Sequence, residues 1–152
     1  MADFPGAIGE SVAILGALDP AAIAATTSVT SWGSAAKFKK VGAILLLGAT
    51  NGTIEMELRQ ATDSSGTGAK DFSPAVAFTA AIFGAATDNT QGMLSCDVAR
   101  CMDVDNGFTH FAASVVSGGT TNVFGVILLG AGNRFGDVSS SDDAAVREIV
   151  SV

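Results

Sequence analysis

The chain has 152 residues, 48% of them hydrophobic, which fits one domain with enough apolar side chains for a sizeable core. Eight Lys and Arg against 15 Asp and Glu give a net charge of −7, and this argues against a nucleic-acid partner, because phosphate binding depends on a basic surface. The 18 glycines, nine phenylalanines and a charged fraction of only 15% favour short strands joined by small-residue turns over a helical bundle.

The first part of the chain carries two strand-like segments, at 13–18 and 26–32. Between them, DPAAIAA has the start signals of one short helical turn, with Asp19 as the N-cap and Pro20 at the first helical position. No Lys or Arg precedes Lys37, so the basic region of a secretory signal is missing. The longest apolar run, 41–49, is about half the roughly 20 residues of a membrane-spanning helix, and we expect a soluble protein made in a cytoplasm.

The clearest pair of strands flanks residues 51 and 52. KFKKVGAILLLGAT changes from basic to continuously apolar, as does a strand that leaves the rim of a sheet for the middle of a sandwich. TIEMELRQAT alternates strictly, and this predicts a strand with one buried face (Ile54, Met56, Leu58) and one wet face (Glu55, Glu57, Arg59). Asn51-Gly52 lies between the two and supplies the positive φ angles of a type I′ turn, so we expect a tight antiparallel hairpin here.

Further strands are expected at 75–80, 92–98, 108–116 and 123–129, separated by loop sequences at 63–70, 84–92 and 117–121. VGAILLLGAT and FGVILLGAGN resemble each other, as two central strands of one sandwich would. About eight antiparallel strands joined by such loops predict an all-β fold, a β-sandwich of jelly-roll-like type forming a single domain over 1–152.

The glycine cluster after the last strand is close to a dinucleotide-binding motif. Its glycines are Gly130, Gly132 and Gly136, so the third comes one residue late, and no apolar helical period follows at once. A buried strand that leaves its sheet through a glycine turn is the better interpretation.

The remaining chemistry-bearing residues do not form a catalytic or metal-binding set. His110 is the single histidine and alternates with apolar neighbours, which predicts a residue on a strand surface. Cys96 and Cys101 have an unusual spacing for zinc ligands, and no further Cys is present to complete a site, so free buried thiols are expected. A disulfide between them is possible only if the turn that joins them is tight. DVDNG at 103–107 departs from a calcium loop and predicts an acidic turn. We therefore expect no enzyme, no metal and no cofactor.

Two long stretches carry a resemblance to a known family: SWGSAAKFKKVGAILLLGATNGTIEMELRQATDSSGTGAKDF and DVDNGFTHFAASVVSGGTTNVFGVILLGAGNRF. They resemble the decoration, or cement, proteins encoded beside capsid genes in tailed phages and prophages. The shared pattern is a basic and aromatic lead-in to an apolar strand, an amphipathic strand ending in Gln, an aromatic-polar-aromatic strand, and a hydrophobic strand ending in glycines and Arg-aromatic. The matching positions are 37–47, 53–60, 107–111 and 126–135.

This resemblance implies a β-sandwich attached to the outside of the icosahedral head of a double-stranded DNA phage, where it reinforces the shell against internal pressure. The implied partners are the major capsid protein and further copies of the chain, most often as a homotrimer, with no nucleic acid and no membrane. The implied location is the outer surface of the virion, after synthesis in the host cytoplasm. The acidic balance of the chain is compatible with that position.

The two ends, 1–12 and 136–152, are small-residue segments that either fray or extend as arms onto a neighbouring subunit. An ordered arm needs a surface to bind, because its few apolar side chains cannot offset the entropy of ordering its backbone. The candidate interface residues at or near these ends are Phe4, Pro5, Ile8, Arg134, Phe135, Val146 and Ile149.

Two other functions remain open from the sequence. A tail-tube or head–tail joining subunit would form rings and carry a long mobile loop, for which 61–72 is the candidate. A carbohydrate-binding or other ligand module is disfavoured by the absence of Tyr and the single Trp32, because sugar platforms are usually built from exposed Trp and Tyr.

Overall fold

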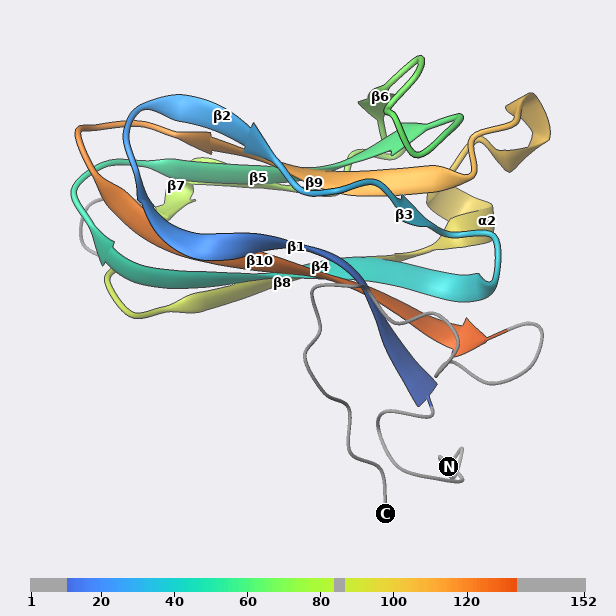
Figure 1. Ribbon diagram of the computed structural model, residues 1–152, viewed down its shortest axis with the longest axis horizontal. Coiled ribbons are helices and arrows are strands. Elements are labelled where there is room, and N and C mark those ends of the chain that lie inside the picture. Colours follow the sequence, from blue (N-terminus) through green and yellow to red (C-terminus); the bar gives the residue numbers. More distant parts are fainter. Residues whose placement is uncertain (1–10, 84–86, 134–152) are drawn as a thin grey trace.

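Figure 1 shows the computed structural model of the chain, which describes residues 11–83 and 87–133. In this part of the chain the strands are β1 (Val12–Ile23), β2 (Thr26–Val29), β3 (Gly33–Ser34), β4 (Phe38–Thr50), β5 (Ile54–Ala61), β6 (Lys70–Asp71), β7 (Ala77–Phe83), β8 (Gln91–Asp97), β9 (His110–Ser117) and β10 (Asn122–Asn133). A short helix, α2 (Val98–Cys101), and a 3-10 turn, η1 (Val104–Asn106), lie between β8 and β9.

The strands form two antiparallel sheets that pack face to face (Figure 1). One sheet has the order β1-β10-β4-β8, and the other has β2-β9-β5-β6, with β3 also paired to β9 and β7 also paired to β5. The chain passes back and forth between the sheets, so that the first and last strands of the described residues, β1 and β10, are neighbours in one sheet while β2 and β9 are neighbours in the other. This is the strand order of a jelly roll, and it confirms the predicted all-β sandwich.

The core lies between the sheets and follows the alternation of the strands. In β5, the residues predicted to be buried, Ile54, Met56 and Leu58, are at most 1% exposed. The facing sheet supplies residues that are equally buried, among them Leu45 of β4 and Phe124 of β10. The period-2 pattern therefore assigned the buried face of this strand correctly.

The predicted hairpin at Asn51-Gly52 is wrong. The strands on either side, β4 and β5, lie in different sheets, so the turn connects the two layers of the sandwich. Neither residue has a positive φ, as a type I′ turn would require. Gly52 is needed for another reason, because an added Cβ would overlap the carbonyl oxygen of Gly118 in the loop between β9 and β10.

A buried asparagine completes the contact between these two loops. The side-chain oxygen of Asn122 accepts hydrogen bonds from the backbone N–H groups of Asn51 (3.0 Å) and Gly52 (3.1 Å). Its side-chain nitrogen donates to the hydroxyl of Ser117 (2.7 Å) and the carbonyl of Gly118 (2.6 Å). The turn therefore takes its conformation from a residue far along the chain, which the local hairpin rule does not consider.

The predicted helical turn at 19–25 is also wrong, because β1 continues as a strand to Ile23. The pairing of β1 with β10 shifts register between Leu18 and Ala21, which accommodates Pro20 as a bulge. Since β1 is an edge strand, a residue without an N–H group costs no ladder bond on its free side.

The two similar apolar runs are central strands of the sandwich, as predicted, and they are also adjacent, because β4 and β10 pair along most of their length. The glycine cluster at the end of β10 differs from the prediction, since the strand runs through Gly130 and Gly132 to Asn133. An added Cβ at Gly130 would lie 2.7 Å from a ring carbon of Phe38, so this glycine admits an aromatic side chain of the core. Gly136 lies outside the described residues.

Candidate interaction faces

The two sheets of the sandwich expose different chemistry on their outer surfaces. In β4, the buried residues Val41, Ala43 and Leu45 point into the core, so that the intervening residues of the strand point away from it. The register of the neighbouring strands then assigns each side chain to the inner or the outer side. We call the outer surface of the β1-β10-β4-β8 sheet the apolar face and that of the other sheet the polar face.

Two rows of paired residues cross the apolar face from β1 to β8 without a charged side chain. They are Ile14–Leu129–Gly42–Ser95 and Ala17–Ile127–Ile44–Met93. Leu46 of β4 and Met93 of β8 are 39% and 59% exposed on this face. An exposed sheet surface normally carries polar residues at these positions, so an apolar surface of this kind indicates contact with another surface.

A cluster of cations borders the apolar face at one end, and we call it the basic corner (Lys39, Lys40 and Arg100). Lys40 pairs with Asp97 across β4 and β8, with 3.6 Å between nitrogen and oxygen and both groups exposed. Lys39 and Arg100 line a shallow hollow of about 520 Å³ together with Asp97 and Ala99. Neither Lys39 nor Arg100 forms an ion pair with a carboxylate in the part of the chain that the structure describes.

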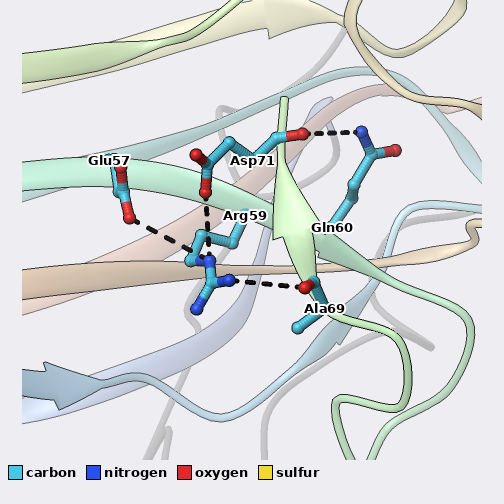
Figure 2. A network of polar contacts seen from close by, with 5 residues as sticks. All are labelled: Glu57, Arg59, Gln60, Ala69 and Asp71. Carbon is cyan, nitrogen blue, oxygen red and sulfur yellow. Dashed lines mark hydrogen bonds and ion pairs between the residues drawn. The ribbon is translucent and has the colours of Figure 1, made fainter. Parts of the chain in front are cut away.

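The polar face carries a network centred on Arg59 (Figure 2). The guanidinium Nε donates to the carboxylate of Asp71 at 3.2 Å, and the carboxylate of Glu57 lies 4.0 Å from the same nitrogen. The Nη2 atom donates to the carbonyl of Ala69 at 3.3 Å. These contacts stabilise the pairing of the two-residue strand β6 with β5. They also give Arg59 carboxylate partners within the polar face.

Glu57 borders a hollow of about 410 Å³ over the polar face, which Glu55, Phe78, Thr79 and Val116 also line. Partial burial raises the pKa of the Glu57 carboxyl, and the nearby charge of Asp71 raises it further, although Arg59 opposes both effects. Two carboxylates beside an aromatic ring are groups that a polar, ring-shaped ligand could contact.

Beneath this network, Gln60 is a fully buried polar side chain with both of its ends bonded. Its nitrogen donates to the carbonyl of Asp71 (3.0 Å), and its oxygen accepts from the N–H of Asp103 (2.7 Å). Asp103 begins the acidic turn predicted at 103–107, where Gly107 has a φ of 83°. Hydrogen bonds from Lys70 and Asn106 hold the pKa of Asp103 below its ordinary value.

The two cysteines are free, as expected, and they lie together. Cys96 and Cys101 line a hollow of about 350 Å³ with Lys40 and Arg100 at its rim. Burial raises the pKa of the Cys96 thiol, and contact with the Cys101 thiol raises it further. Because the thiolate is the reactive form, Cys96 is a weak nucleophile at neutral pH.

His110 occupies the first position of β9, half-buried, as the alternation predicts for a strand-surface histidine. Its Nδ1 lies 3.0 Å from the hydroxyl of Thr109. In the described ranges, no three His, Cys, Asp or Glu side chains come close enough to hold a metal ion. Nor does any helix there have the length and apolar character needed to cross a membrane.

The interface residues predicted from the chain ends lie outside the described residues, so their roles stay predictions: Phe4, Pro5, Ile8, Arg134, Phe135, Val146 and Ile149. The apolar face was not predicted, although the sequence carries a signal for it. A strand with one wet side alternates, whereas GAILLLG in β4 and GVILLG in β10 are apolar at nearly every position. Such runs are typical of strands covered on both sides.

No protein-family model matches the chain, and no curated protein is similar enough to be matched. Solved structures with a similar fold include that of infectious bursal disease virus, Gt strain, with 12% identity and a TM-score of 0.47 over 83% of this chain and 34% of the viral one. The chain thus spans about a third of the length of that protein. Broad bean stain virus matches at 12% identity and a TM-score of 0.40, over 90% of this chain and 92% of the other. A family 11 carbohydrate-binding module from Clostridium thermocellum matches at 12% identity and a TM-score of 0.41, over 89% and 96%. No function follows from similarity at this level.

Proposed function

We propose that the protein is a structural component of a virion and, more particularly, a decoration protein that binds the outside of the head of a tailed double-stranded DNA phage. The observation that carries this proposal is the unequal chemistry of the two outer faces. A protein that covers a shell needs one surface that adheres and another that faces water, and the apolar and polar faces supply these on opposite sides of one rigid sandwich.

The sequence resemblance to phage decoration proteins supports the same function, and it adds the major capsid protein as partner and a homotrimer as the assembled form. The action is mechanical: bound copies link neighbouring shell subunits and oppose the pressure of packaged DNA. Each contact can be weak, because a linked subunit rebinds at high effective concentration once its neighbour is attached. A tail-tube function has less support. It would need a long mobile loop, whereas in the loop after β5 the backbone N–H groups of Ser65 and Thr67 donate hydrogen bonds to the Asp63 carboxylate.

The test compares phage particles that contain the protein with particles that lack it. Complete particles should release their DNA at a higher temperature, and the purified chain should co-sediment with particles that lack it and restore the release temperature. Equal release temperatures, together with no co-sedimentation, would reject the proposal. A major capsid protein gene next to the gene for this chain would support it.

A carbohydrate-binding module is the second candidate, and the hollow lined by Glu55, Glu57 and Phe78 on the polar face is the observation that favours it. Calorimetric titration with soluble β-glucans separates the two functions. Saturable binding that Phe78→Ala abolishes would favour the carbohydrate module over the decoration protein.

A further inference from the structure

The cationic side chains of this acidic chain differ in whether they have a carboxylate partner. Arg59 and Lys70 are neutralised by carboxylates of the polar side of the molecule, at 3.2 Å from Asp71 and 2.6 Å from Asp103. Lys39 and Arg100, in contrast, are exposed without a carboxylate partner among the described residues, at the end of the apolar face. In a chain with a net charge of −7, unpaired cations at the border of an apolar surface indicate a partner with acidic groups at the corresponding position.

We propose that the apolar face and the basic corner form one docking surface, and that it binds a protein surface that is apolar at its centre and acidic along one edge. This inference rests on the proposed function, in which that partner is the capsid shell. It assigns an orientation to the bound chain: the β1-β10-β4-β8 sheet lies against the shell, and the polar face points to solvent.

A second copy of the chain fits this surface less well. The two apolar rows and the next row, Val12–Ala131–Lys40–Asp97, cover this surface. These three rows contain one carboxylate, Asp97, which already pairs with Lys40. Two apolar faces packed on each other would therefore bring Lys39 and Arg100 no new acidic partner from these rows. The surplus of negative charge on each copy opposes the same contact.

The size of the surface agrees with attachment to a shell. Four strands about 4.8 Å apart and three rows about 6.7 Å apart cover roughly 400 Å² on each partner. The total of roughly 800 Å² is below the ~1,200 Å² of a stable pair of proteins, so a single contact is weak. Repetition over many linked sites supplies the missing affinity.

Two matched substitutions test the orientation. Met93 on the apolar face and Val116 on the polar face are both exposed apolar side chains, at 59% and 42%, so that glutamate at either position buries no charge, although a carboxylate at position 116 lies opposite Glu55. Binding is measured by co-sedimentation with heads assembled without this chain. Met93→Glu should weaken binding at least tenfold, whereas Val116→Glu should bind as the wild type does. Thermal unfolding verifies that each variant is folded, and Leu46→Gln replaces Met93→Glu if the latter is not.

Charge is tested separately, with salt as the variable. Binding of the wild type should weaken as ionic strength rises, because the contacts of exposed charges are screened. The double variant Lys39→Gln, Arg100→Gln should bind more weakly at low salt and should respond less to added salt. Lys70→Gln removes a cation on the polar side and serves as the matched control, with a salt response equal to that of the wild type.

The possible results separate the inference from the function on which it rests. A wild-type chain that fails to bind heads overturns both. Wild-type binding that Met93→Glu leaves unchanged, or that Val116→Glu alone abolishes, overturns the docking surface and leaves the decoration function standing. A purified chain that sediments as a dimer, and as a monomer after Met93→Glu, identifies a second copy as the occupant and overturns the proposed partner.

Discussion

Replacing Asn122 by alanine should be among the most destabilising single changes in this protein. The side chain is 0% exposed and makes four hydrogen bonds, to Asn51, Gly52, Ser117 and Gly118. A net contribution of about 1 kcal/mol for each bond gives a loss of ~4 kcal/mol, and groups left buried without a partner add to it. Since a domain of this size has a stability of about 5–15 kcal/mol, the loss is a large share of the total.

The assay is equilibrium unfolding in urea, followed by circular dichroism, which gives the free energy of unfolding and its dependence on denaturant. Asn106→Ala is the control, because that side chain is exposed and makes one bond, at 2.7 Å to Asp103, so its loss should stay below about 1 kcal/mol. If Asn122→Ala also loses less than about 1 kcal/mol, the two loops do not depend on this side chain and the reasoning is refuted.

Asn122→Asp separates the acceptor role of this side chain from its donor role. The variant keeps an acceptor for the N–H groups of Asn51 and Gly52, but it places a carboxylate against the carbonyl of Gly118. Burial and this carbonyl both disfavour the charged form, so the pKa of the new carboxyl should be raised in the folded state. Stability relative to the wild type should then be greater at low pH, where the protonated group can donate, and should fall as the pH rises through that pKa.

Three further changes have expected outcomes. Glu57→Gln should raise the free energy of unfolding at pH 7 by no more than about 0.5 kcal/mol, because burial and the charge of Asp71 raise the pKa of this half-buried carboxyl and so disfavour its charged form. A melting temperature below that of the wild type would contradict this. Asp88 accepts bonds from the N–H and hydroxyl of Thr50, which lower its pKa, so its charge stabilises the fold above the ordinary Asp pKa and this contribution is lost as the pH falls through the lowered value. The stability difference between the wild type and Asp88→Asn should accordingly shrink as the pH falls below the ordinary Asp pKa toward the lowered value in acid titrations of stability, and a constant difference would exclude the effect. Gly52→Ala should cost more than about 2 kcal/mol in urea unfolding, since the new methyl group overlaps the Gly118 carbonyl oxygen, and a neutral result would mean that the loop yields easily.

The elements that could be predicted are those in which local pattern and tertiary environment agree. The alternation in β5 separates Ile54 and Met56 from Glu55 and Glu57, and one buried side of a sandwich requires that separation. The likeness of the two apolar runs also predicted correctly that they are central strands of the sandwich, and the structure adds that they are neighbours in one sheet. A strand can be predicted from a single sequence when its local pattern agrees with its tertiary environment in this way.

The errors have a common physical cause, which is a long-range partner that overrides a local rule. Asn51-Gly52 has the composition of a hairpin turn, yet β4 pairs with β10 and β8, and Asn122 supplies the bonds that orient the turn. DPAAIAA has the composition of a helix start, yet β10 offers a strand edge along which it can pair. A single sequence gives the local pattern but not the distant strand or side chain that overrides it.

The candidate site was not predicted from the sequence. The interface residues predicted from the chain ends, as arms that dock on a neighbouring subunit, lie outside the described residues and stay predictions. The apolar face could have been found by asking why Ile44 and Leu46 are apolar when the neighbouring residues already fill the core. The basic corner could not, because it joins Lys39 at the start of β4 to Arg100 in α2, and only the fold brings them together.

The position of β10 between β1 and β4 also determines when the protein can fold during synthesis on the ribosome. Until residues 122–133 have left the exit tunnel, β1 has no partner in its sheet, and β4 can pair on one side alone. The nascent chain therefore carries open strand edges with apolar side chains on both surfaces, which is the state most exposed to pairing with another chain. Pairing strands that are far apart in the sequence is slow. A chain truncated before residue 122 should therefore aggregate instead of forming a smaller folded domain.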